Sequence, residues 1–497
     1  MQTLPKPLNT ELESYFEPFR KNIIGIDLTF ESPYGKQQVV YTDWTASGRL
    51  YRPIEEKMMH SFGPFVANTH TDTSVMGTTM THAYHHARGI IKKHVNASAD
   101  DVLVTCGTGM TGAVNKFQRI LGLKLPEHFK NSVSIPDAER PVVFVSHMEH
   151  HSNQTSWLET IAKVVVIPCN EEGLFCLENV KAVLEAHKDV PYKIASITSC
   201  SNVTGVTTPY YEVAKLMHRA NGLCFVDFAC SAPYIDINMH PEDPEAYLDA
   251  IFFSPHKFLG GPGTSGVLVF DKKLYKNKVP DNPGGGTVTW TTPWGTHSYI
   301  DNIEEREDGG TPGFLQVIRI SLAMRLKEQM GVDNILQREH ELLTYLFDRI
   351  GNHEEIQILA GEHRERLGVI SFNIGNLHHD LAVKLINDRF GIQSRGGCSC
   401  AGTYGHYLLG INEEMSDDIV KKVLAEGSCE LKPGWIRVSI HPTTTNAEIE
   451  FICDSILAVA ENYKDWQRAY TFRMNKYMHE SELKIAPSAL SRTWFNL

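Results

Sequence analysis

Residues 194–227 read IASITSCSNVTGVTTPYYEVAKLMHRANGLCFVD, and this stretch decides the fold. It begins and ends with short apolar runs, residues 194–199 and 223–227, of the kind found in strands that are buried on both faces. Residues 210–221 between them have the spacing of a helix. A strand, a helix and a strand in this order predict an α/β fold with a mainly parallel sheet.

Three more apolar runs extend this pattern. They are VLVTC at 102–106, VVFVS at 142–146 and AIFFS at 250–254. After Thr311-Pro-Gly313 the pattern changes to a long helical stretch over residues 315–349 and a strand over 369–374, which predicts a smaller α+β domain. We expect four parts: an N-terminal segment at 1–40 that packs with the small domain, a large domain at 41–311, the small domain at 312–465, and a C-terminal appendage at 466–497.

The composition narrows the classes of function. The 497 residues are 42% hydrophobic and 21% charged, as in ordinary globular proteins. A net charge of −12 without any run of five Lys or Arg argues against nucleic acid as a partner. Since no stretch of about 20 apolar residues and no leader in residues 1–19 is present, we expect no membrane attachment and a cytoplasmic location. The ten cysteines are expected to be thiols in a reducing compartment.

The residues after each strand are the candidates for function, because open parallel sheets bind ligands beyond the carboxyl ends of their strands. GTGMTG at 107–112 follows the first run. Its small residues let the backbone at Thr108, Gly109 and Met110 approach an anion at the start of a helix, which predicts a phosphate site. A plain strand-to-helix turn is the alternative, and the Lys-Ser/Thr ending of a nucleotide P-loop is absent.

MEHHSN at 148–153 follows the second run. An imidazole can stack on an aromatic ring and still transfer a proton, and we favour His150 for this role. A surface or hydrogen-bonded structural histidine is the alternative. We assign no metal, because neighbouring histidines project differently and no third ligand with suitable spacing appears nearby.

The third and fourth runs lead to Asn202 and Asp227. The amide of Asn202 can donate to a phenolate oxygen, although a turn-forming Asn is the simpler interpretation. A carboxylate at Asp227 can keep a pyridine nitrogen protonated, which makes the ring an electron sink. The alternative for Asp227 is a cap of the next turn.

SPHK at 254–257 ends the fifth run and precedes a glycine-rich turn. Partial desolvation there would lower the pKa of Lys257 and make its amine nucleophilic toward an aldehyde, whereas a single Lys is ordinarily a solvated charge. An anion loop, a His, an Asn, an Asp and a Lys follow successive strands. Together they predict pyridoxal 5′-phosphate, joined as a Schiff base to Lys257.

These motifs resemble those of pyridoxal-phosphate enzymes of aminotransferase class V, in the branch of cysteine desulfurases and selenocysteine lyases. The similarity runs from about residue 41 to about residue 462, and it is most specific in MEHH, SNVTG, VDFA, SPHK and GIQSRGGCSCA at 391–401. It implies the fold type I architecture with a seven-stranded sheet, and a homodimer with active sites at the subunit interface. The resemblance also assigns residues: Lys257 to the Schiff base, His150 to ring stacking, Asp227 to the pyridine nitrogen, Ser254 and His256 to the cofactor with His256 on its phosphate, and Thr287 of GGGT to the phosphate in the neighbouring subunit.

Four residues bear on the substrate. By the same resemblance Arg437, in WIRVS at 435–439, binds the substrate carboxylate, and Arg395 is a second contributor. Without the resemblance both would be surface charges. Cys400 falls on the position of the sulfur-accepting nucleophile, and Cys398 is a second thiol where the common pattern has one. The arrangement GCxC also resembles the aminotransferase-like domain of molybdenum cofactor sulfurases. Cys398 can assist, resolve a persulfide, or be structural.

The resemblance implies that L-cysteine gives L-alanine and a persulfide on Cys400, with a sulfur-acceptor protein as a candidate partner. The alternatives are a selenocysteine lyase, a cysteine or cystine β-lyase, an amino-acid epimerase, or a scaffold without catalysis. One departure is Cys230 in DFAC at 227–230, where many desulfurases carry a Gln that bonds O3′ of the cofactor. This departure leaves Asn202 to make that bond.

Overall fold

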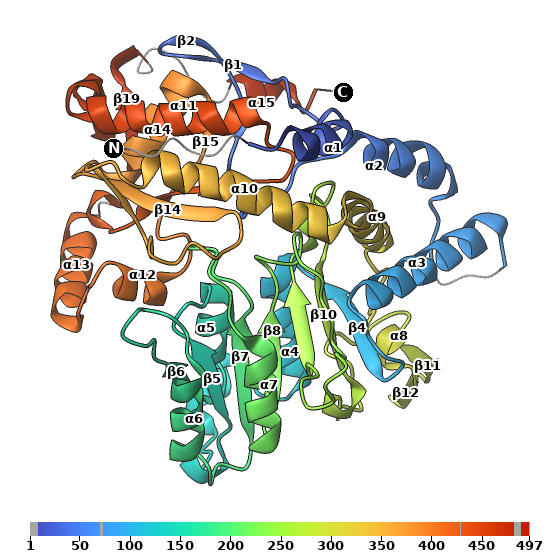
Figure 1. Ribbon diagram of the computed structural model, residues 1–497. Helices are drawn as coiled ribbons and strands as arrows, with labels where there is room; N and C mark the ends of the chain where they lie inside the picture. The colour runs from blue at the N-terminus through green and yellow to red at the C-terminus, as the bar shows by residue number, and fades with distance from the viewer. Residues whose placement is uncertain (1–7, 70–72, 428, 482–488, 497) are drawn as a thin grey trace.

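The computed structural model describes residues 8–69, 73–427, 429–481 and 489–496, so the expected N-terminal segment and C-terminal appendage fall partly outside the described residues. Its centre is a seven-stranded sheet in the order β4-β10-β9-β8-β7-β5-β6 (Figure 1). Neighbouring strands from β6 to β9 are parallel, while β10 runs antiparallel to β9 and to β4. The strands are β4 (Asp101–Cys106), β5 (Val142–Ser146), β6 (Lys163–Ile167), β7 (Lys193–Thr198), β8 (Leu223–Asp227), β9 (Ala250–Phe253) and β10 (Gly266–Asp271). The mainly parallel, seven-stranded sheet is thus confirmed.

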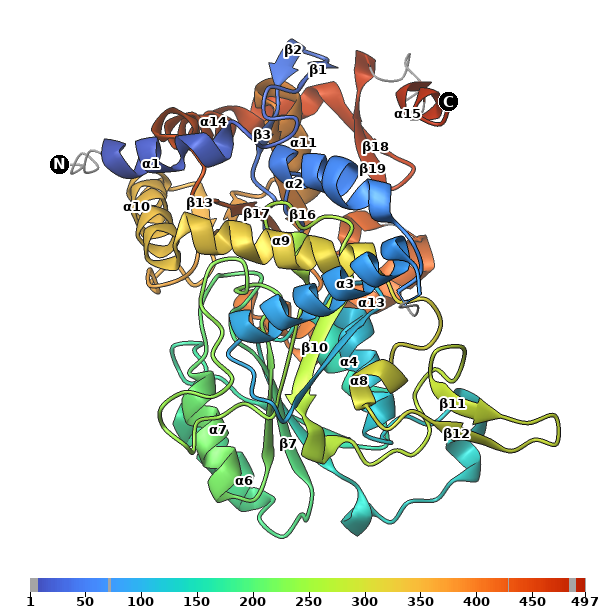
Figure 2. The same ribbon diagram turned by 90° about the vertical axis from the view of Figure 1, so that its right-hand side faces the viewer.

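Strand β8 shows why these runs are apolar throughout. Cys224 and Val226 belong to a hydrophobic core that includes residues of α3, α6, α7 and α9, whereas Phe225 belongs to a second core with α4 and α5. Successive residues of a strand point to opposite faces, so helices cover both faces of the sheet. Figure 2 shows α3 and α9 side by side. These helices are α3 (Val75–His94), α4 (Gly109–Ile120), α5 (His151–Leu158), α6 (Leu177–Ala186), α7 (Tyr210–Arg219) and α9 (Phe314–Met330).

Two strands of this sheet, β6 and β10, were not among the five expected runs. Strand β10 has the same apolar character as the others. It follows β9 through a 3-10 turn at Pro255–Lys257 and a glycine-rich segment rather than through an α-helix. A parallel return needs a long crossover, usually a helix, so this short connection brings β10 back antiparallel.

The small domain is built on a four-stranded antiparallel sheet in the order β13-β14-β17-β16. The helical stretch expected over residues 315–349 is divided in two. The chain forms two helices, α9 and α10, that meet at Gly331, whose φ of +73° a helix cannot continue through. The elements are α10 (Val332–Ile350), α11 (His379–Phe390), α12 (Gly402–Leu408), α13 (Glu413–Glu426), α14 (Asn446–Trp466), β13 (Ile356–Ile358), β14 (Val369–Ile374), β16 (Arg395–Gly397) and β17 (Trp435–Ser439).

Segments near both termini lie against the small domain (Figure 1). Strand β3 pairs in parallel with β15, and helix α1 contacts α10. Within the described residues, no helix is both long and apolar enough to cross a membrane. The remaining elements are α1 (Thr10–Arg20), α2 (Arg52–Lys57), α8 (Ile303–Arg306), α15 (Ala489–Thr493), β3 (Val40–Tyr41), β15 (Ile392–Gln393), and the hairpins β1 (Thr29–Ser32) with β2 (Gly35–Gln38), β11 (Val288–Thr291) with β12 (His297–Tyr299), and β18 (Tyr470–Arg473) with β19 (Lys476–His479).

Candidate active site

The carboxyl ends of the large-sheet strands and a loop of the small domain form a pocket. The expected site residues that line it are Thr108, Met110, His150, Asn202, Asp227, Ser254, His256, Lys257, Arg395, Cys400 and Arg437. Gly109 lies directly beside it, against Ser254 and His256. Cys398 and Thr287 do not line this pocket. Side chains from distant parts of the sequence therefore meet in one place, which makes the pocket the candidate active site.

The turn from β4 to α4 forms one end of the pocket. Gly107 and Gly109 have φ of +52° and +60°, and a Cβ atom on Gly109 would lie 2.8 Å from Ser254 Oγ. The N–H of Met110 donates to the same Oγ at 2.8 Å. The hydroxyl of Thr108 makes no capping bond to the helix that it precedes. The other N–H groups of the first turn of α4 and these hydroxyls are the donors that an anion needs.

Asp227 and Lys257 provide the charged groups at the strand ends. Asp227 accepts a bond from the N–H of Ala229 at 2.8 Å, and burial raises its pKa to about 6 against the opposing effects of that bond and of Lys257. Burial lowers the pKa of Lys257, while Cys230 and Asp227 act in the opposite direction. The amine is thus more easily deprotonated than an exposed Lys, as a nucleophile requires.

Residues 398–401, here called the Cys loop, form a tight turn that carries the two thiols. The N–H of Ala401 donates to the carbonyl of Cys398 at 3.0 Å, and the two central residues, Ser399 and Cys400, have φ of +51° and +58°. Such angles are uncommon for residues other than glycine, so contacts outside the turn must hold it in place. The turn places Cys400 in the pocket and leaves Cys398 exposed.

The neighbouring histidines have different tasks. His150 lines the pocket, and its Nδ1 accepts the N–H of Ser152 at 3.1 Å. Burial is the main cause that lowers the pKa of His150, to about 3, so its ring is neutral at physiological pH. His151 holds the Cys loop: its N–H donates to the carbonyl of Cys400 at 2.7 Å, and its Nε2 accepts the N–H of Gly402 at 2.9 Å.

Asn202 also holds the Cys loop. Its amide Nδ2 donates to the carbonyl of Ser399 at 2.7 Å. This bond uses one of the two amide hydrogens, so the expected contact between Asn202 and the cofactor rests on the other one. The same residue therefore joins the strand-end part of the pocket to the small domain.

The two predicted arginines lie opposite each other on neighbouring strands, with Arg395 of β16 paired to Arg437 of β17. Arg437 is 2% exposed. It donates to the carbonyl of Asn202 at 3.0 Å and to Oδ1 of Asp43 at 2.6 Å. The other oxygen of Asp43 lies 4.0 Å from Nη1 of Arg395. The structure thus places both arginines at the pocket and adds an acidic partner.

Sequence reasoning missed Asp43 and Cys200. Asp43 follows a short apolar run at residues 39–41, which is a strand-end signal of the type used for Asp227. Cys200 lines the pocket two residues beyond the end of β7. Cys200 and Cys230 lie close together, since their Sγ atoms are 3.6 Å and 3.7 Å from the same carbonyl, that of Ser201. The pocket therefore carries two buried thiols besides Cys400.

Thr287 is buried outside this pocket, and its hydroxyl donates to the carbonyl of Gly284 at 2.7 Å. Its expected contact with a neighbouring subunit stays a prediction. Elsewhere in the described residues, His378, His379 and Asp380 bring three possible metal ligands within 4.8 Å of one another. They do not line the pocket, and the ring of His379 already contacts the Asp380 carboxylate at 3.0 Å.

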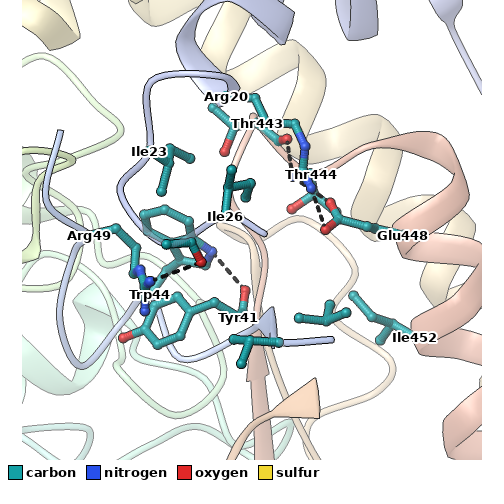
Figure 3. Close-up of a pocket in the computed structure, with 13 residues that line it drawn as sticks. Arg20, Ile23, Ile26, Tyr41, Trp44, Arg49, Thr443, Thr444, Glu448 and Ile452 are labelled. Atoms are coloured by element: carbon teal, nitrogen blue, oxygen red, sulfur yellow. Dashed lines mark hydrogen bonds and ion pairs between the residues drawn. The ribbon is translucent and has the colours of Figure 1, made fainter. Parts of the chain in front are cut away.

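A second hollow lies beside the segment that leads to Asp43 (Figure 3). Several of its polar side chains already have partners: Arg20 donates to Glu448 at 2.7 Å, and Arg49 donates to the carbonyl of Ile24 at 3.0 Å. Trp44 donates to the carbonyl of Tyr41 at 3.0 Å. These contacts anchor the chain, and we assign no ligand to this hollow.

The residues of the candidate active site fit pyridoxal phosphate. An anion cradle in which Gly109 leaves no room for a Cβ suits the phosphate. A buried carboxylate at Asp227 suits a protonated ring nitrogen, and a desolvated amine at Lys257 suits an aldehyde.

Comparisons with known proteins agree with this fit. The family model of aminotransferase class V matches residues 40–452. A probable cysteine desulfurase of Halalkalibacterium halodurans is 29% identical over 370 residues, which cover 73% of this chain and 84% of that protein. One of Staphylococcus epidermidis is 27% identical over 377 residues, covering 75% and 85%.

Among solved structures, the apo cysteine desulfurase of Thermococcus onnurineus shares the fold, with a TM-score of 0.71 at 22% identity, and the match covers 93% of this chain and 100% of that one. Because the family model matches most of its length, the chain belongs to aminotransferase class V, a family of pyridoxal-phosphate enzymes.

Proposed function

We propose that this enzyme is a cysteine desulfurase, which converts L-cysteine to L-alanine and keeps the sulfur as a persulfide on Cys400. The observation that carries the proposal is that Cys400 and Lys257 line the same pocket. Cys400 reaches this pocket from a turn whose two central residues have uncommon positive φ angles. The names of the two bacterial relatives support the same reaction.

Several residues would hold the cofactor. The first turn of α4, Ser254 and His256 would hold the phosphate, Asp227 would face the ring nitrogen, and His150 would cover the ring. When bound, pyridoxal phosphate supplies an electron sink that makes the Cβ–S bond of cysteine labile.

The substrate is handled by three groups. Arg437 binds the α-carboxylate through N–H groups that Asp43 and Asn202 do not use. Lys257 Nζ takes the α-proton, and burial favours this role because it lowers the pKa of the amine. Cys400 Sγ then attacks the substrate sulfur. An S–S bond forms as the Cβ–S bond breaks, and the electron pair stays with the carbon, which a proton converts to the methyl group of alanine.

The proposed reaction also suggests an oligomeric state, a partner and a cellular location. We propose a homodimer, a sulfur-acceptor protein as the partner that empties Cys400, and a cytosolic location. A reducing cytosol would keep Cys398 and Cys400 as thiols.

The visible spectrum of the purified protein before and after addition of L-cysteine tests the function. Alanine and sulfide are assayed in the same sample with a thiol reductant. The proposal expects a visible band that Lys257→Ala abolishes, and alanine and sulfide in equal amounts. Pyruvate and ammonia instead would identify a β-lyase, and a protein that takes up no cofactor would contradict the proposal at its first step.

A further inference from the structure

Asp43 lies between two arginines at the edge of the active site. Its Oδ1 is 2.6 Å from Nη2 of Arg437, and its Oδ2 is 4.0 Å from Nη1 of Arg395. The Arg437 side chain is 3% exposed, that of Asp43 19% and that of Arg395 44%. Each oxygen of one carboxylate thus faces a different guanidinium.

The backbone fixes Asp43 in this place. Asp43 forms an isolated bridge with Ser439 of β17, two residues after Arg437. The hydroxyl of Ser439 accepts a bond from the N–H of Thr45 at 3.0 Å, and the backbone N–H of Ser439 donates to the carbonyl of Thr42 at 2.7 Å. Figure 3 shows the bond from the Trp44 ring to the carbonyl of Tyr41, which closes the segment that contains Asp43. These backbone contacts hold the main chain of Asp43 beside β17, and the bond to Arg437 orients its carboxylate.

The carboxylate of Asp43 sets the net charge of the site formed by Arg395 and Arg437, here called the two-arginine clamp. Arg395 and Arg437 carry two positive charges and Asp43 one negative charge, which leaves a net charge of +1. Arg437 has five N–H donors, of which one goes to Asp43 and one to Asn202, so three remain. The clamp retains donors for a carboxylate, and its charge matches one anion.

We propose that Asp43 is a specificity-determining residue that restricts the site to amino acids with a single carboxylate. This inference rests on the proposed function, in which Arg437 binds the substrate. A second carboxylate on the substrate would be drawn to Arg395, the more exposed cation, and would there face the Asp43 carboxylate. Like charges a few ångströms apart in a partly desolvated site repel strongly, so a dicarboxylic amino acid is rejected while cysteine and alanine are admitted.

Calorimetric titration of the cofactor-loaded enzyme with L-alanine and with L-aspartate tests this. The measured quantity is the ratio of the dissociation constant of aspartate to that of alanine. Asp43→Asn, which keeps the shape of the side chain, is expected to lower this ratio at least tenfold. Asp43→Glu should keep it near the wild-type value. The double variant Asp43→Asn/Arg395→Gln restores a net charge of +1, and it should bring the ratio back.

The controls separate selectivity from simple positioning. If Asp43 only orients Arg437, Asp43→Asn weakens both ligands together, and a ratio unchanged within twofold would overturn the proposal. If the Asp43→Asn variant does not fold, Arg395→Gln alone tests the proposal. In that variant the clamp has no net charge, so the ratio of the aspartate to the alanine dissociation constant should rise at least threefold. Asp418→Asn, on the exposed surface of α13, is the matched control. A wild-type enzyme that binds alanine selectively but releases no sulfur from cysteine would remove the proposed function and leave this inference standing.

Discussion

The strand-end part of the active site and the Cys loop differ in what holds them. Asp227 is the last residue of β8, where it pairs with Phe252 of β9, and Lys257 lies in the 3-10 turn that directly follows β9. Cys400 lies in a turn with two positive φ angles, held by His151 and Asn202 of the large domain. The residues expected to act on the cofactor are therefore positioned by the large sheet itself. The position of Cys400 depends instead on how the small domain packs against that sheet.

The largest effect is expected where the sheet itself supplies the chemistry. Lys257→Ala should remove the visible band and lower turnover of L-cysteine by roughly 10³-fold or more, because both the covalent attachment and the proton transfer are lost. Alanine formation and absorbance are the measurements. Lys273→Ala, at a largely exposed Lys, is the control and should match the wild type.

The Cys loop should give the next largest effect, without loss of the cofactor. Cys400→Ala is expected to lower alanine formation by roughly 10²-fold, because the nucleophile that takes the sulfur is gone. The visible band should stay. Cys398→Ala, at an exposed thiol of the same turn, should change the rate of alanine formation less than about threefold. Equal losses in the two variants would contradict the division between the inward and the outward thiol.

Asp227, at the end of β8, is expected to affect the free energy of unfolding as well as turnover. Burial raises its pKa to about 6, so the folded protein binds this proton more tightly than the unfolded chain does. The charged carboxylate therefore destabilises the cofactor-free protein above pH 6, and this penalty disappears as the pH falls to about 4. Asp227→Asn should raise the free energy of unfolding by about 2 to 3 kcal/mol at pH 8. The Asp227→Asn substitution should also slow turnover, because a neutral amide cannot keep the ring nitrogen of the cofactor protonated as a carboxylate does.

Urea denaturation of the cofactor-free protein at pH 8 and at pH 4 measures this prediction. The gain from Asp227→Asn should be present at pH 8 and nearly absent at pH 4. A variant that is less stable at both values would show that the carboxylate stabilises the empty site.

The smallest effect is expected from the contacts that dock the Cys loop. His151→Ala removes the acceptor for the N–H of Gly402, a bond of about 1 kcal/mol, so alanine formation should fall roughly two- to tenfold. The visible band and the affinity for cofactor should not change, since His151 does not line the pocket. A loss of the band would mean that loop and sheet are not separate units. His363→Ala serves as the control, because His363 does not line the pocket and is not part of the Cys loop.

The two regions also differ in how far the sequence alone predicts them. Apolar strands followed by polar residues predicted β4, β5, β7, β8 and β9 and the place of Lys257, because this signal is local. The contacts of Asp43 with Arg437 and of Asn202 with Ser399 join residues that lie far apart in the chain. No local pattern encodes such pairs. The break at Gly331 within the expected helical stretch depends on a φ of +73°, which the pattern of apolar residues does not encode.

The most direct test of the account is to locate the sulfur after one turnover. The loaded enzyme is mixed with less than one equivalent of L-cysteine without reductant, alkylated, and digested for mass spectrometry, while alanine is counted in the same sample. We expect one persulfide on Cys400 for each alanine formed. Alanine formed in full in wild type and in Cys400→Ala, with no persulfide on the peptide that contains residues 398–401, would contradict it.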